Sequence, residues 1–73
     1  MTETKTVKTE VVNERRVGWT PKGYSNYSVK EAIIRDGEIC SFPQVTACLV
    51  KADPDGCIEF IQAIRRAMDE TAK

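Results

Sequence analysis

Histidine is absent from the 73-residue chain. It titrates nearest to neutral pH and is the commonest metal ligand, so the usual general base and any Cys/His zinc site are excluded. Cysteine is scarce, and Cys40, Cys48 and Cys57 form no CxxC pair. An odd number of cysteines in apolar runs predicts buried free thiols in a reducing compartment. We therefore expect a non-enzymatic protein with no cofactor and no metal.

Long apolar runs and an excess of either charge are also missing. No run approaches the ~20 residues that a transmembrane helix needs, and the polar start of the chain has no apolar signal region. Eleven basic residues balance eleven acidic ones. The sequence therefore predicts a cytoplasmic protein without a membrane segment, and one less basic than proteins that coat nucleic acid.

The chain is also short. We expect a flexible N-terminus over 1–6 and one small α+β domain over 7–73. At this size apolar burial barely offsets the lost conformational entropy, and no disulfide or metal is indicated. Self-association would supply the missing core, so a homodimer is expected.

The clearest pattern is a closing amphipathic helix that starts at Asp53-Pro54 and runs to Glu70. Asp53 suits the N-cap because its carboxylate accepts hydrogen bonds from free N–H groups, and proline suits the first helical position. Apolar residues then recur at steps of three and four. This stripe consists of Cys57, Phe60, Ile61, Ile64, Ala67 and Met68.

Strand-like patterns precede the helix. Period-two alternation of β-branched residues from Val7 to Trp19 indicates a half-buried strand, followed by a Gly/Pro/Ser/Asn-rich loop to Asn26. A mostly apolar run, Val45 to Val50, indicates another short strand after the interruption at Pro43.

The segment 27–42 admits two structures. Asp36-Gly37 between apolar flanks favours a type I′ hairpin, with Arg35 opposite Glu38 and Ile34 opposite Ile39. The alternative for 28–36 is a short helix capped at Ser28. The good cross-strand register favours the hairpin. The resulting fold class is α+β: an antiparallel meander of about four strands with one C-terminal amphipathic helix on one face.

A basic and aromatic window is the main candidate binding site. From Arg15 to Lys30 the chain has four basic residues and no acidic one. Basic side chains neutralise phosphates, and unpaired bases stack on aromatic rings. Equally, Trp19 suits the core, and the tyrosines and arginines suit an ordinary solvated surface. The candidate residues for nucleic-acid or partner binding are Arg15, Arg16, Trp19, Lys22, Tyr24, Tyr27 and Lys30.

The closing helix carries a second candidate surface off its apolar stripe. Ile58, Gln62, Arg65 and Arg66 are its residues, and they would contact a partner or a second copy. The simpler interpretation is a solvated face on which Arg65 and Arg66 pair with Asp69 and Glu70 at i,i+4.

The helix also carries a family resemblance. Gly56-Cys57-Ile58-Glu59-Phe60, with Ala63-Ile64 and Met68-Asp69-Glu70 after it, resembles the last helix of purine-rich-element (PUR-type) binding repeats. Their order of elements is shared by PC4-type transcription cofactors. The resemblance implies that the sheet binds single-stranded nucleic acid and that two copies pair.

Two functions are therefore expected as alternatives. The first is a homodimeric module that binds single-stranded nucleic acid through the window from Arg15 to Tyr27. The second is a protein-binding inhibitor or adaptor of the kind phages and mobile elements carry, which acts by covering the surface of a host protein.

Overall fold

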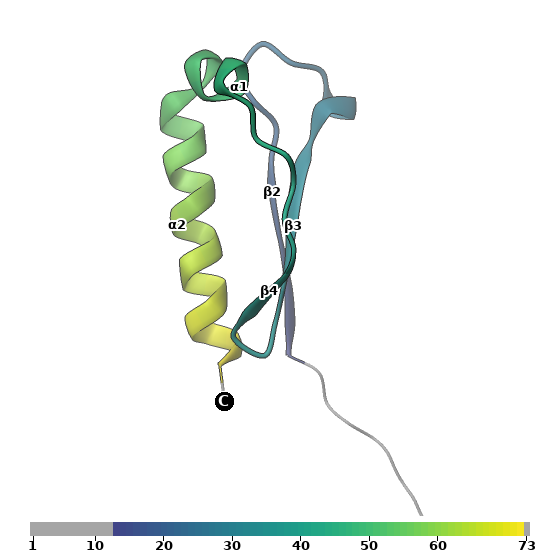
Figure 1. The fold of residues 1–73 in the computed structure, drawn as a ribbon, viewed down its shortest axis with the longest axis vertical. Helices are drawn as coiled ribbons and strands as arrows, with labels where there is room; N and C mark the ends of the chain where they lie inside the picture. Colours follow the sequence, from purple (N-terminus) through teal and green to yellow (C-terminus); the bar gives the residue numbers. More distant parts are fainter. Residues whose placement is uncertain (1–12, 73) are drawn as a thin grey trace, which may run out of the picture.

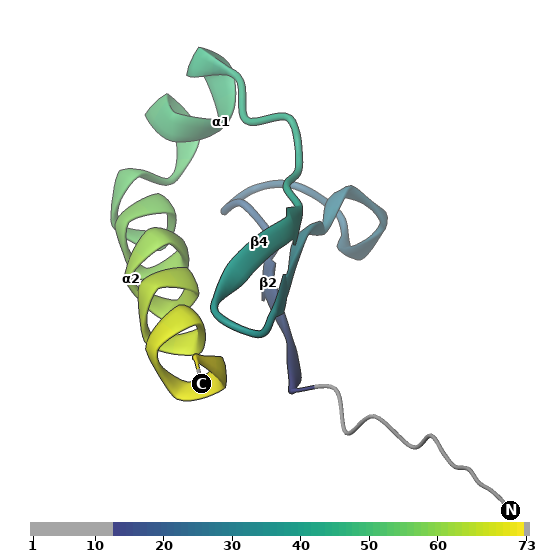
Figure 2. The same ribbon diagram turned by 60° about the horizontal axis from the view of Figure 1, so that its bottom comes forward.

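The computed structural model describes residues 13–72 (Figure 1). The element order is β2 (Glu14–Trp19), a 3-10 turn η1 (Asn26–Ser28), β3 (Lys30–Arg35), β4 (Glu38–Ser41), α1 (Ala47–Ala52) and α2 (Pro54–Thr71). The strands form an antiparallel sheet of order β2-β3-β4, and α2 lies along one face of it (Figures 1 and 2). The α+β class is confirmed. The predicted flexible N-terminus and the part of the first strand before Asn13 lie outside the described residues.

The strand β2 follows the predicted alternation. Trp19 is buried and Val17 packs against the core, whereas Arg16 is exposed on the other face of the sheet. Val17 lies opposite Ala32 of β3, and Trp19 lies opposite Lys30. The face that carries the odd positions of β2 is therefore the one that α2 covers.

The hairpin prediction is correct. Asp36 and Gly37 both have positive φ, of 52° and 84°, as a type I′ turn requires. Arg35 lies opposite Glu38, and Ile34 lies opposite Ile39. The strand β3 begins at Lys30, however, later than the predicted start at Tyr27, because Tyr27 belongs to the turn η1.

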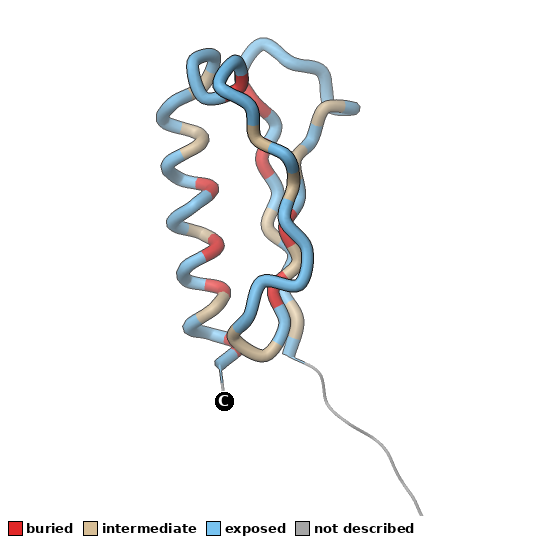
Figure 3. Tube along the Cα trace, viewed as in Figure 1, coloured by how far each residue is buried: buried red, intermediate tan, exposed pale blue. Residues whose placement is uncertain are grey.

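The helix α2 begins and packs largely as predicted. The Asp53 carboxylate caps it by accepting from the Gly56 N–H at 3.1 Å, and Pro54 occupies the first turn. Its buried residues Phe60, Ile64 and Ala67 meet Trp19, Ala32, Ile34 and Leu49 in the core (Figure 3). Ile61 was predicted within this stripe but is 49 % exposed. It follows the buried Phe60 directly and therefore lies about 100° around the helix from it, on the flank of α2.

Thr71 takes a core position that the apolar pattern did not predict. It is fully buried, its hydroxyl donates to the Ala67 carbonyl at 2.7 Å, and its oxygen accepts from the Gly37 N–H at 3.0 Å. The end of α2 is thereby hydrogen-bonded to the hairpin turn.

The predicted strand over 45–50 is wrong. Residues Ala47–Ala52 form the short helix α1, so the described residues contain three strands rather than four. The helix buries Leu49 in the core and leaves Val50 exposed, while Val45, just before the helix, packs against the core. Burial of Leu49 therefore outweighs the weak strand preference of a short apolar run.

The expectation of buried cysteines is also wrong. All three thiols are free, but Cys40 and Cys48 are exposed and Cys57 is only partly buried. Cys48 points outward because α1 turns Leu49 inward. Cys40 lies on β4, all four residues of which are exposed.

Candidate binding site

The arginines of the predicted window are paired with acidic residues in space. On the face of the sheet away from α2, the Arg16 guanidinium lies 3.5 Å from Glu31 and 3.6 Å from Glu14. On the other face, Arg15 lies 3.7 Å from Glu70 of α2. The window has no acidic residue in sequence, but its arginines meet Glu14, which directly precedes it in β2, Glu31 of β3 and Glu70 of α2, so its strand half presents little free positive charge.

The same face holds a stronger ion pair between β2 and β3. Arg35 donates to Glu14 at 2.7 Å, and Glu14 and Arg35 are directly opposite in the register. This hydrogen bond lowers the pKa of Glu14 and raises that of Arg35. Both side chains are substantially exposed, so the pair fixes the local geometry more than it stabilises the fold.

Trp19 is also unavailable to a ligand, because it is 7 % exposed and its ring packs against Phe60 at 5.6 Å between centroids. Its indole N–H donates to the Asp53 carboxylate at 2.9 Å. The core interpretation of Trp19 is therefore correct, and this residue positions the site rather than binding.

The loop after β2 is anchored to the core and to the start of α2. Pro21 is fully buried, and the Tyr24 N–H donates to the Pro21 carbonyl at 3.0 Å across a turn. Gly23 supplies the positive φ, 86°, that this turn needs. The Lys22 N–H donates to Asp53 at 3.2 Å. The loop is thus tied to the same carboxylate as Trp19 and the start of α2.

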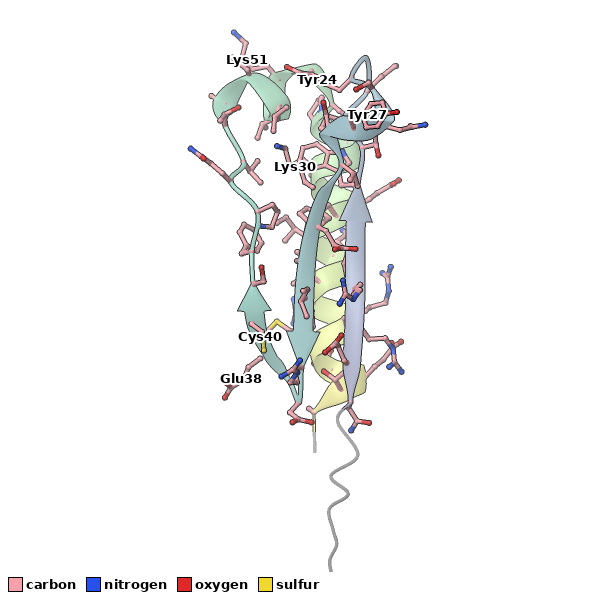
Figure 4. All side chains as sticks on the ribbon, turned by 90° about the vertical axis from the view of Figure 1, so that its right-hand side faces the viewer. Tyr24, Tyr27, Lys30, Glu38, Cys40 and Lys51 are labelled. Atoms are coloured by element: carbon pink, nitrogen blue, oxygen red, sulfur yellow. The ribbon has the colours of Figure 1, made fainter. Side chains whose placement is uncertain are left out.

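Tyr24 and Tyr27 are exposed on this anchored loop, Tyr27 at 99 % and Tyr24 at 42 %. The turn η1 projects on the side of the sheet away from α2 (Figure 1). Figure 4 shows both tyrosines, Lys30 and Lys51 at the end of the molecule that carries α1. We call the set Lys22, Tyr24, Tyr27, Lys30 and Lys51 the loop surface.

The lysines of the loop surface form no ion pair within residues 13–72. Asp53 and Asp55 at the start of α2 and Glu31 beside Lys30 lie at the same end of the molecule as the three lysines, so positive and negative charges nearly balance there. Lys51 was not among the predicted residues, because the residues before it were assigned to a strand. Two features of the sequence could have indicated the short helix α1: the helix cap at Asp53, which directly follows it, and the apolar residue Leu49.

The second candidate surface divides between two sides of α2. Gln62 and Arg66 line a cleft of ≈ 460 Å³ between α2 and the end of β2, with Gly18, Trp19 and Phe60. Ile58 is 55 % exposed and Arg65 is exposed, and neither lines this cleft. The four residues therefore do not form one contact region. Glu70, predicted to pair with Arg66, contacts Arg15 instead.

An exposed apolar surface lies on the β4 side of α2. Phe42 packs on Phe60, at 6.3 Å between ring centroids, yet is 49 % exposed, and Ile39 and Ile61 are exposed to a similar extent. The helix α2 covers β2 and β3 but leaves β4 largely uncovered. Apolar side chains of β4 and of the helix flank consequently remain in solvent.

Other kinds of site find no support in the described part of the chain. Residues 13–72 contain no group of three or more Cys, Asp or Glu side chains placed to hold a metal ion. Among the same residues, no helix is both long and apolar enough to span a bilayer.

Comparison of the chain with protein-family models, curated proteins and solved structures found no match. The resemblance to PUR-type and PC4-type modules therefore remains a prediction.

Proposed function

We propose that this protein is a small non-enzymatic binding module whose loop surface binds single-stranded nucleic acid. The observation that carries the proposal is Tyr27, which is 99 % exposed on an anchored loop, at the end of the molecule that also carries Lys30 and Lys51 (Figure 4). A base that stacks on such a ring contributes ~1–3 kcal/mol. The lysines add attraction to the phosphates.

The proposal differs from the sequence-based expectation in one respect. Arg15 and Arg16 are already engaged by Glu70, Glu14 and Glu31, so the loop half of the window carries the binding. Because acidic residues nearly balance the lysines at this end, the affinity depends more on stacking than on charge, and the salt dependence should be shallow.

Fluorescence titration of a labelled single-stranded oligonucleotide at low salt tests the proposal. We expect Tyr27→Ala to weaken binding by about tenfold, since ~1.4 kcal/mol of lost stacking corresponds to that factor. Lys22→Ala with Lys30→Ala should weaken it further. The matched control, Arg65→Ala with Arg66→Ala, removes the same charge from α2 and should leave binding unchanged. If both double variants lose affinity equally, binding is non-specific and the loop surface is not the site.

A protein partner is the second candidate, favoured by the exposed apolar surface on the β4 side. Ile39, Phe42 and Ile61 are each nearly half exposed, which is typical of surfaces that a partner covers. As an inhibitor or adaptor the protein would act by occluding a host protein there. Capture of a stoichiometric partner from a nuclease-treated host extract, lost on Ile61→Lys but kept on Tyr27→Ala, would favour this function over nucleic-acid binding.

A further inference from the structure

The cleft of ≈ 460 Å³ between α2 and the end of β2 has no part in the functions proposed above. Small residues keep it open, with Gly18 on β2 and Gly56 and Ala63 on α2. Its apolar lining comes from Trp19 and Phe60, which are both buried. The cleft therefore offers a ligand an apolar base and, at Gly18, strand backbone that no side chain shields.

One side of the cleft is an edge of the sheet. The strand β2 is outermost in the order β2-β3-β4, and no strand lies beside it within residues 13–72 (Figure 4). It pairs with β3 over six residues in continuous register, whereas the register of β4 shifts between Ile33 and Ile34. A regular edge can accept a further strand, and an irregular one is less suited to it. Of the two edges, β2 is therefore the better template.

The hydrogen bonds between β2 and β3 determine which groups of β2 face outward. The Asp36 N–H donates to the Asn13 carbonyl, and these two residues continue the register of the pair. Bonded and non-bonded positions alternate along antiparallel strands, so the odd-numbered residues of β2 bond to β3. The N–H and C=O groups of Arg16 and Gly18 consequently point away from β3. Those of Gly18 lie at the cleft.

We propose that this cleft binds an extended peptide segment of a partner protein, which adds to the sheet as a strand antiparallel to β2. Strand addition to a free edge is a common mode of peptide recognition, and antiparallel pairing is the more stable form. The peptide residue opposite Gly18 exchanges two backbone hydrogen bonds with it. This inference is independent of nucleic-acid binding, because no residue of the loop surface lines the cleft.

Two charges on α2 select the peptide. Glu59 and Arg66 line the cleft, are exposed, and form no ion pair with any residue of 13–72. They lie seven residues apart, or about 10 Å along the helix. The helix runs antiparallel to β2, since its N-cap contacts Trp19 and Glu70 near its end contacts Arg15. Glu59 is therefore the charge closer to the end of β2.

The direction of the peptide then fixes the order of its charges. Opposite residues share a face, so the peptide residues beside Trp19 and Val17 point toward α2, as these two do. In an antiparallel strand the residue beside Trp19 comes first. It lies on the side of Glu59 and is basic, whereas the residue beside Val17 lies on the side of Arg66 and is acidic.

The residue between these two charges points to the other face of the sheet, over Gly18. The side chain of Val29, which is 51 % exposed, passes 3.7 Å from the position of a Cβ atom on Gly18. An aromatic ring in this place covers a glycine on a strand edge and buries part of Val29. The preferred segment is therefore basic, aromatic and acidic in that order.

Fluorescence anisotropy of a labelled peptide with Lys-Phe-Glu at its centre, titrated with the full-length protein, tests the charge order. The control peptide has the same composition with the order Glu-Phe-Lys. We expect the wild type to bind Lys-Phe-Glu more tightly by about three- to tenfold, because reversal replaces exposed ion pairs with like-charge contacts. The double variant Glu59→Arg with Arg66→Glu should reverse this preference. Arg65→Glu changes a residue outside the cleft and should leave it unaltered.

N-methylation of the Lys-Phe-Glu peptide tests the strand pairing. A methyl group on the phenylalanine nitrogen removes the N–H that donates to the Gly18 carbonyl, so binding should weaken by about tenfold or more. The lysine N–H points away from β2, and its methylation should change the affinity far less.

Four results would overturn the proposal: no binding of Lys-Phe-Glu by the wild type, a wild-type preference for Glu-Phe-Lys, the same preference in the wild type and the charge-swapped double variant, or equal effects of the two N-methyl groups.

Discussion

Replacement of Gly56 by alanine should destabilise this protein, although the same change in most helices is stabilising by about 1 kcal/mol. Gly56 lies in the first turn of α2, under the Asp53 carboxylate and the Trp19 indole. A Cβ atom there would lie 2.6 Å from Asp53 Cγ and 2.6 Å from Trp19 Nε1, and closer still to a carboxylate oxygen. These groups have little freedom to move, because Asp53 accepts hydrogen bonds from Trp19, Lys22 and Gly56.

The magnitude follows from two opposing terms. Forcing a methyl group into a filled site costs about 1–3 kcal/mol, whereas the helix-propensity gain is at most about 1 kcal/mol. The free energy of unfolding should therefore fall by roughly 1–2 kcal/mol, which lowers the Tm of a domain of this size by roughly 5–15 °C.

Chemical denaturation followed by circular dichroism and by Trp19 fluorescence measures this change. Gly18→Ala is the matched control, because its Cβ would lie 3.7 Å from Val29, an ordinary van der Waals distance. That variant should remain close to wild-type stability. A Gly56→Ala protein as stable as the wild type would refute the reasoning, since it would mean that Asp53 and Trp19 rearrange without loss.

Three other outcomes are expected. The hydrogen bond from Trp19 lowers the pKa of Asp53 below its usual value of 3.8. The charged carboxylate therefore stabilises the folded protein fully at a pH above 3.8, and this stabilisation is lost as the pH falls through the lower pKa that Asp53 has in the folded state. Asp53→Asn should abolish this part of the pH dependence of unfolding, as monitored by Trp19 fluorescence during acid titration. Gly37→Ala should lower stability more than Gly23→Ala in thermal melts: both need positive φ, but only at Gly37 would the Cβ press on Ala72, at 3.2 Å. Thr71→Val should cost about 1–3 kcal/mol and speed amide exchange at Gly37, whose N–H would lose its acceptor.

The hairpin was predictable because its determinants are local. Asp36-Gly37 specifies the turn, and the turn sets Arg35 opposite Glu38 and Ile34 opposite Ile39. Beyond Ile34 the register shifts, so that Ile33 lies opposite Ser41. The start of α2 was predictable for the same reason, because Asp53 and Pro54 act on the turn that directly follows them.

The helix α1 and the exposed cysteines were missed because their determinants are tertiary. Val45 to Val50 suits a strand as well as a helix, and the choice depends on whether Leu49 reaches the core. Once α1 forms, Cys48 must face outward.

The pairing of the arginines was missed for a related reason. A window without acidic residues looks basic in sequence, but Arg16 meets Glu31 from the adjacent strand, and Arg15 meets Glu70 from the far end of the helix. Predicting these pairs requires the sheet register and the placement of α2 together. The exposure of Tyr27 follows from its place in η1, before β3 begins, rather than at the start of the strand where the sequence placed it.

The Asp53 carboxylate joins residues that are far apart in the chain, since Trp19 precedes it by 34 positions and Lys22 by 31. During synthesis the hairpin emerges first, with the inner sides of Trp19, Ala32 and Ile34 uncovered until α2 follows. The nascent polypeptide therefore completes its fold only after most of the chain has left the ribosome. Until then, the apolar inner face of the sheet is exposed to chaperones and to aggregation.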